Sequence, residues 1–214
     1  MKISISGHSG IGKTTLAKEI SNRYGIPFVT TSSKPIWEKH GIESQADIIQ
    51  RSALDPQWGI QFQCDLINYR VAELSMYPKY VTDRSLLDNW VYFIVNISAF
   101  TDTQTMRAYQ SLVNQAGDGI YDESNIQIHL ASEWDMINGK IEMDGLRISN
   151  PYFQTMVNGV FEQSIERRDV ELPNFTYIKG WDMAHRLERV NDIIQHVLRD
   201  INKDTREKFN IKQK

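Results

Sequence analysis

Short apolar stretches and longer amphipathic stretches alternate along this chain, which is the pattern of an α/β protein. Runs of alternating or continuous apolar residues predict strands at positions 2–6, 28–30, 80–82, 126–130 and 175–179. Between them, apolar residues recur every three or four positions, which predicts helices. These helices are expected at 15–20, 45–54, 55–76, 86–97, 103–116, 151–168 and 183–201. The four residues at 44–47, Ser-Gln-Ala-Asp, predict a capping box at the start of the second. The alternation predicts a mainly parallel five-stranded sheet with helices on both faces.

The composition is that of an ordinary single domain. The 214 residues carry a formal net charge of −3, so no overall positive field attracts nucleic acid. The one cysteine, Cys64, cannot form an internal disulfide and suits a reducing compartment. No apolar run approaches the roughly 20 residues that span a membrane, and Met1-Lys2 leads directly into the first strand without a signal peptide. We therefore expect a cytoplasmic protein without membrane contact.

A motif of eight residues follows the first predicted strand. Positions 7–14, Gly-His-Ser-Gly-Ile-Gly-Lys-Thr, fit the phosphate-binding pattern G-x-x-x-x-G-K-[ST] without a gap. Between a strand and a helix, the backbone N–H groups of such a loop point at phosphate oxygens. Lys13 would reach the β- and γ-phosphates of ATP, and the Thr14 hydroxyl would ligate Mg²⁺. The residues expected to bind the nucleotide are Gly7, Ser9, Gly10, Ile11, Gly12, Lys13, Thr14 and Thr15.

A second polar cluster, Asp83-Arg84-Ser85, follows the strand predicted at 80–82. Ligands of parallel sheets bind at the carboxyl ends of the strands, so this cluster is expected beside the phosphate loop. There the Asp83 carboxylate could hold Mg²⁺ or accept a proton, and the Arg84 guanidinium could bind phosphate. The alternative is that Asp83 only caps the following helix.

A third cluster combines two aromatic residues with an amide on one predicted helix. The segment 58–70 spells W-x-x-x-F-Q and ends in Arg70. Trp58 and Phe62 share one helix face and Gln63 lies beside it, which suits a pocket that stacks a nucleobase and hydrogen-bonds its edge. Arg70 lies two turns further along and could reach Asp83 or a phosphate. The alternative is that the two rings belong to the core.

The segment 58–70 resembles the deoxynucleoside kinases, in which a W-x-x-x-F-Q segment and a following arginine line the base pocket. That family continues with E-R-S, whereas the triplet at 83–85 is similar to the D-R triplet of the thymidylate kinases. Residues 83–88, 144–147 and 150–153 also resemble P-loop kinases related to nicotinamide riboside kinase, with their D-R-S-x-L-D pattern. The resemblance covers residues 2 to about 194 and implies a P-loop NTPase fold.

The resemblance implies a role for each matching residue. It assigns Gln63 to the base, Asp83 to Mg²⁺ or catalysis, and Arg84 to the phosphates. Arg147 stands where such kinases have a lid arginine that closes over ATP, in a lid expected around 132–150. Lys34 stands where deoxynucleoside kinases carry a catalytic Glu, and a lysine there suits an acceptor that already carries phosphate. The expected catalytic residues are Lys13, Asp83, Arg84 and Arg147, and the expected substrate-binding residues are Lys34, Trp58, Phe62, Gln63 and Arg70.

We therefore expect an ATP- and Mg²⁺-dependent kinase that acts on a deoxynucleoside monophosphate or a deoxynucleoside. One domain is expected at 1–198, followed by a flexible tail at 199–214. Two alternatives stay open. The first is a P-loop kinase that phosphorylates a modified (hydroxymethyl) base or an end in DNA, which the acidic net charge disfavours. The second is a regulatory ATPase that transfers nothing. The expected partner is a small-molecule acceptor, and the chain could act as a homodimer.

Overall fold

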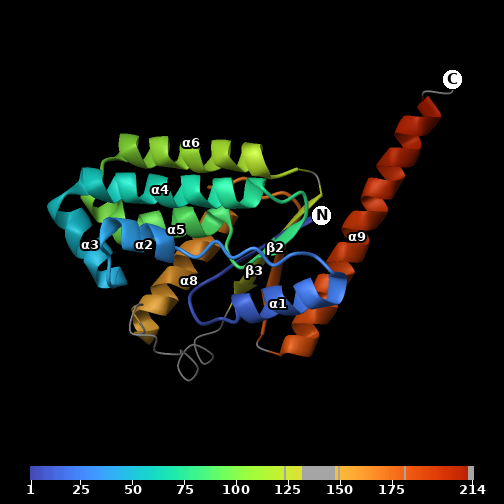
Figure 1. Cartoon of the computed structure of the whole chain (residues 1–214), viewed down its shortest axis with the longest axis horizontal. Coiled ribbons are helices and arrows are strands. Elements are labelled where there is room, and N and C mark those ends of the chain that lie inside the picture. The colour runs from blue at the N-terminus through green and yellow to red at the C-terminus, as the bar shows by residue number, and fades with distance from the viewer. Residues whose placement is uncertain (123, 132–147, 149, 181, 212–214) are drawn as a thin grey trace.

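The computed structural model describes residues 1–122, 124–131, 148, 150–180 and 182–211 (Figure 1). Within these residues the chain forms, in order, β1 (Lys2–Ser6), α1 (Lys13–Tyr24), α2 (Lys34–His40), α3 (Gln45–Leu54), α4 (Pro56–Ser75), β2 (Tyr80–Thr82), α5 (Leu86–Ile97), the short 3₁₀ helix η1 (Ser98–Phe100), α6 (Thr103–Ile120), β3 (Asn125–Ala131), α8 (Pro151–Glu166), β4 (Phe175–Lys179) and α9 (Met183–Ile211). The α/β class predicted from the alternation is confirmed.

The sheet formed by the described residues has four parallel strands in the order β2-β1-β3-β4. The fifth strand predicted at 28–30 is wrong. This segment makes one bridge to β2, between Phe28 and Val81, and the Val29 N–H donates to the Val81 carbonyl at 2.9 Å. Pro27 has no N–H with which to extend the ladder, so its carbonyl only accepts a hydrogen bond from Val81. The segment therefore pairs briefly with the sheet edge before the chain enters α2.

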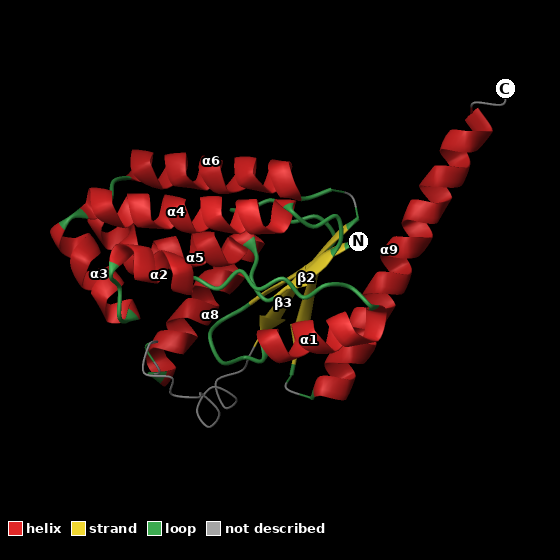
Figure 2. Ribbon diagram, in the orientation of Figure 1, coloured by secondary structure: helices red, strands yellow, loops and turns green. Residues whose placement is uncertain are grey.

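The two faces of the sheet meet different helices. Ile3, Ile5 and the equivalent residues of the other strands pack against α1 and α9 in one apolar core. On the opposite face α5 and α8 belong to a second core that also includes α4 and α6 (Figures 1 and 2). The strand side chains on this second face are mostly polar although they are buried: Ser4, Ser6, Asn125, Gln127 and His129. The central strands thus have one apolar face and one polar face.

Local capping explains where several helices begin. Ser44 and Asp47 form the predicted capping box of α3, and Ser85 and Asp88 form a second one at α5. Helix α2 was not predicted; it begins with a proline in its first turn, where the missing N–H costs nothing. Helix α9 continues to Ile211, beyond the end expected near 201. The division into a domain and a tail stays a prediction. None of the helices in the described ranges is long and apolar enough to cross a membrane.

Candidate active site

The phosphate loop at 7–14 connects the end of β1 to the start of α1, where the motif placed it. Three glycines adopt backbone angles that other residues rarely reach, with φ of 140° at Gly7, 81° at Gly10 and 90° at Gly12. A Cβ atom on Gly7 would lie 2.7 Å from the carbonyl oxygen of Leu130 in β3. The loop therefore lies directly against the neighbouring strand, and only glycine fits at its first position.

The start of α1 is suited to bind an anion. Gly12 is the N-cap, and no side chain among the described residues caps the helix, which leaves the first-turn N–H groups for phosphate oxygens. The buried Lys13 folds over the loop, because its Nζ donates to the carbonyls of Gly7 at 2.7 Å and His8 at 2.8 Å. Burial lowers the pKa of His8 to about 4, so this imidazole is neutral near pH 7. Lys13 therefore supplies positive charge inside the loop.

Thr14 and Asp83 meet at the carboxyl end of the sheet. Asp83 directly follows β2, and the Thr14 hydroxyl donates a short hydrogen bond to its Oδ2. A hydroxyl and a carboxylate side by side are oxygen ligands of the kind that Mg²⁺ prefers, so this pair fits the ion that accompanies ATP. The helix-capping alternative for Asp83 is wrong, because Ser85 is the N-cap of α5 and Asp88 completes the capping box.

Arg84 lies next to Asp83 and enters a pocket beside the loop. Its Nη1 donates to Oδ1 of the buried Asp88 at 3.2 Å. Burial disfavours the guanidinium charge, but the negative charge of Asp88, with smaller contributions from Tyr92 and Asp83, raises the pKa of Arg84 above its usual value. A permanent positive charge at this position can bind phosphate oxygens of the donor or of the acceptor.

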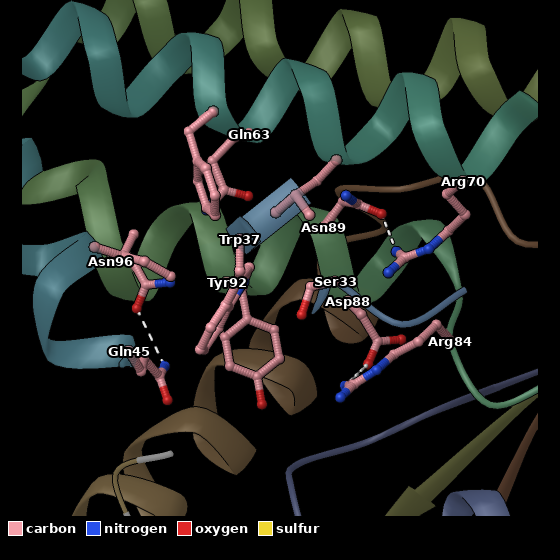
Figure 3. A pocket seen from close by; sticks show the side chains of 13 residues that line it. Ser33, Trp37, Gln45, Gln63, Arg70, Arg84, Asp88, Asn89, Tyr92 and Asn96 are labelled. Atoms are coloured by element: carbon pink, nitrogen blue, oxygen red, sulfur yellow. Dashed lines mark hydrogen bonds and ion pairs between the residues drawn. The ribbon is translucent and has the colours of Figure 1, made fainter. Parts of the chain in front are cut away.

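The pocket is lined by residues of α4 and α5, with further residues from α2, its N-cap and α3 (Figure 3). Of the predicted substrate residues, Phe62, Gln63 and Arg70 line it, together with Arg84. Trp58 does not line the pocket; it stacks against Phe62 with ring centroids 5.4 Å apart. Sequence reasoning missed several lining side chains, because they come from different elements: Trp37, Gln45, Asp88, Asn89, Tyr92 and Asn96.

Two buried side chains bring hydrogen-bonding atoms without partners to this pocket. Gln63 is 1% exposed, and its Oε1 has no hydrogen-bond partner in the part of the chain that the structure describes. Arg70 does not reach Asp83; its Nη1 donates to Asn89 Oδ1 and, at 2.7 Å, to the Ser85 carbonyl, and its Nε has no partner among the described residues. Leaving such an atom unpaired costs about 1–3 kcal/mol, so a polar ligand here would gain from satisfying it.

Lys34 and Arg147 are two further predicted site residues, and neither is placed inside the pocket. Lys34 begins α2, one position after the pocket-lining Ser33, and its side chain is exposed. It therefore lies near the pocket without lining it. Arg147 falls outside the described residues, as does nearly all of the lid expected at 132–150. The roles of Lys34, Arg147 and the lid stay predictions.

Arg186 of α9 is a site residue that sequence reasoning missed. Only 1% of it is exposed, its Nη1 donates to the Ile11 carbonyl inside the phosphate loop at 2.7 Å, and its Nε donates to the Gly180 carbonyl after β4 at 2.8 Å. One guanidinium thus ties together two loops at the carboxyl end of the sheet. The sequence carries no signal for this contact, because Ile11 lies 175 positions away.

Comparison with known protein families agrees with this geometry. A family model described as an AAA domain matches residues 2–122, which is more than half of the chain. The chain belongs to this AAA domain family. Its matched region covers the phosphate loop, Asp83, Arg84 and the whole pocket. No curated protein matches the sequence.

Several solved structures share the fold of this AAA family member. The deoxyadenosine kinase of M. mycoides, solved with the products dCMP and a flexible dCDP, has a TM-score of 0.60 and 18% identity over 95% of this chain and 99% of that chain. The thymidylate kinase of Candida albicans has a TM-score of 0.57 and 15% identity over 91% of both chains. The NadR protein in complex with NR has a TM-score of 0.60 and 10% identity over 90% of this chain and 50% of its own. The resemblance to the deoxynucleoside kinases and the thymidylate kinases is confirmed at the level of the fold.

Proposed function

We propose that this protein is a kinase that transfers the γ-phosphoryl group of ATP, in the presence of Mg²⁺, to a deoxynucleoside monophosphate or a deoxynucleoside. The observation that carries the proposal is that two sites adjoin. Asp83 is hydrogen-bonded to Thr14 of the phosphate loop, and the next residue, Arg84, lines the pocket. A donor in the loop and an acceptor in the pocket would meet at these residues.

Each residue has a distinct task in the proposed reaction. The N–H groups of the loop and Lys13 bind and orient the triphosphate. Thr14 and Asp83 hold Mg²⁺, which offsets negative charge on the phosphate oxygens when it is bound. Asp83 can also accept the proton of a hydroxyl acceptor, and Arg84 binds phosphate oxygens on which negative charge develops. Phosphoryl transfer requires positioning and electrostatic stabilisation more than covalent chemistry, and these residues supply both.

The acceptor is proposed from the lining of the pocket and from the neighbouring structures. Phe62, Trp37 and Tyr92 provide aromatic surface, and Gln63 provides an amide that can pair with a base edge. The M. mycoides deoxyadenosine kinase has been solved with dCTP and with dATP as well as with dCMP and dCDP. These ligands support a deoxynucleotide-type small molecule as the acceptor here. A cytoplasmic location and a homodimer stay predictions.

Transfer from radiolabelled ATP to a panel of acceptors tests the proposal. The panel contains deoxynucleosides, deoxynucleoside monophosphates and DNA duplexes with hydroxymethylated bases, and Lys13→Ala is the control protein. We expect label on one or more of the small acceptors with the parent and none with Lys13→Ala. Label on DNA alone, or ATP hydrolysis that no acceptor stimulates, would contradict the proposal and favour one of the two alternative functions.

A further inference from the structure

The pocket contains a pair of amides, Gln45 and Asn96, at the side away from Arg84. Gln45 begins α3, Asn96 lies near the end of α5, and both line the pocket. Gln45 Nε2 donates to Asn96 Oδ1 at 3.3 Å, and the two residues are only 6% and 3% exposed. Figure 3 shows this amide pair on one side of the pocket and Arg84 with Asp88 on the other. The pocket therefore has an uncharged polar side and a charged side.

The hydrogen bond within the amide pair leaves one whole carbonyl group as an acceptor and one whole NH₂ group as a donor. With Gln45 as the donor, Gln45 Oε1 and Asn96 Nδ2 make no hydrogen bond to any residue that the structure describes. If both amides turn over, Asn96 donates to Gln45, and the pair again offers one donor and one acceptor, in the opposite order. The pair can therefore present either order of donor and acceptor without losing its internal hydrogen bond.

The edge of a nucleobase carries the same two functions. Adenine and cytosine have an amino donor beside a ring acceptor, whereas guanine and thymine have a keto acceptor beside a ring donor. A base whose edge contacts the amide pair would lie along the apolar lining that Ile48 and Phe62 provide. Its sugar and any phosphate would then face the charged side, where Arg84 adjoins Asp83 and the phosphate loop.

We propose that the Gln45–Asn96 pair binds the edge of the acceptor's base and, because both amides can turn over together, accepts amino bases and keto bases alike. This proposal rests on the kinase function proposed above and concerns the specificity of the same site. The pair differs in this respect from Arg70, whose guanidinium is a donor only and is held by Asn89 and the Ser85 carbonyl.

The test compares matched amino and keto acceptors, and an acceptor without an exocyclic amino or keto group, in the parent, Asn96→Leu and Gln45→Met. The third acceptor is the deoxyriboside or deoxyribotide of unsubstituted purine, which keeps only the ring acceptor on this edge. The control is Gln115→Met, an exposed glutamine of α6 whose amide donates to the Ser111 hydroxyl. For the parent we expect kcat/KM values within about tenfold between amino and keto acceptors, and not the roughly 10⁴-fold rejection that fixed hydrogen-bonding groups produce.

Each variant should lower kcat/KM for amino and keto acceptors by about five- to hundredfold, because buried polar atoms of the base lose their partners. The unsubstituted purine acceptor should lose much less, and KM for ATP should not change. If the parent protein accepts only amino acceptors or only keto acceptors, the proposal that the two amides can turn over is wrong. Equal losses with the unsubstituted purine, or melting of both variants below the assay temperature, show that the pair is only structural and overturn the proposal. A parent that phosphorylates no acceptor in the panel instead contradicts the kinase function itself.

Discussion

The phosphate loop and the acceptor pocket adjoin at Asp83 and Arg84, yet they are built in opposite ways. The loop is one continuous stretch, and its binding groups are backbone N–H groups together with Lys13. The pocket is built from side chains on several helices, spread between Ser33 and Asn96. A local motif therefore specifies the donor site, whereas the acceptor site exists only after the helices have packed. The phosphate donor can be inferred from eight letters of sequence, and the acceptor cannot.

The largest effect is expected from the loop. Lys13→Ala should abolish phosphoryl transfer and leave the fold intact, because the side chain lies over the phosphate loop, where its Nζ donates to the Gly7 and His8 carbonyls, and is not part of an apolar core. The rate of phosphoryl transfer at saturating ATP measures the loss of activity, and the midpoint of thermal unfolding shows whether the fold is intact. Lys18→Ala, an exposed lysine on the same helix, is the matched control and should behave as the parent. If Lys13→Ala and the parent are equally active, the assignment of the phosphate loop as the ATP site is wrong.

The second largest effect is expected from Asp83, where the phosphate loop and the acceptor pocket adjoin. Asp83→Asn preserves the shape of the side chain and removes its charge, so kcat should fall by about 10²-fold or more if the carboxylate serves Mg²⁺ or proton transfer. Steady-state kinetics over a range of Mg²⁺ concentrations measures the effect, with the exposed Asp118→Asn as control. A change in thermal stability alone, without a change in kcat, would make Asp83 a structural residue that only positions Thr14.

The same contrast explains how much the sequence revealed. The bounds of β1, β2 and β4 and the capping box at Ser44 followed from local patterns, and the structure confirms them. The strand at 28–30 was wrong because Pro27 limits pairing at the sheet edge. Helical spacing placed Trp58 and Phe62 on one face but could not show that the pocket lies on the side of Gln63. Contacts between distant elements, such as that of Arg186 with Ile11, have no local signature.

A smaller effect is expected inside the pocket. Gln63→Leu removes the buried amide, so a preferred base loses a partner at a cost of about 1–3 kcal/mol. The ranking of bases by kcat/KM should change while KM for ATP stays the same. Gln61→Leu is the matched control, because Gln61 is exposed on the same helix and bonds to Asp65. An unchanged ranking of bases would indicate that Gln63 packs in the protein core and does not bind the base.

Arg186 links the phosphate loop to the loop after β4, so its loss should weaken the binding of ATP more than that of the acceptor. Arg186→Met leaves the carbonyls of Ile11 and Gly180 without this donor, which should lower stability by about 1–3 kcal/mol and raise KM for ATP several-fold. KM for the acceptor should stay near the parent value. Arg189→Met tests the specificity of the effect, because Arg189 lies on the same helix with a side chain that is 51% exposed. A loss of stability without a change in KM for ATP would make Arg186 a purely structural residue.

The smallest effect is expected at the edge of the pocket, where the exposed Lys34 begins α2 next to the pocket-lining Ser33. A charge at this position attracts an acceptor phosphate but does nothing for a neutral nucleoside. Because water and salt screen an exposed lysine, the attraction should amount to about 0.2–1 kcal/mol, smaller than for a buried pair.

Lys34→Ala should therefore lower kcat/KM for the monophosphate by up to about fivefold and leave the matched nucleoside unchanged. Raising the ionic strength should shrink this difference, which a merely structural substitution would not do. Lys79→Ala, an exposed lysine in the turn before β2, is the control. If the parent prefers the free nucleoside, or if Lys34→Ala lowers kcat/KM equally for both acceptors, the acceptor is a nucleoside without a phosphate. Asp83 would then be needed as the base for a hydroxyl group, because no glutamate occupies the position of Lys34.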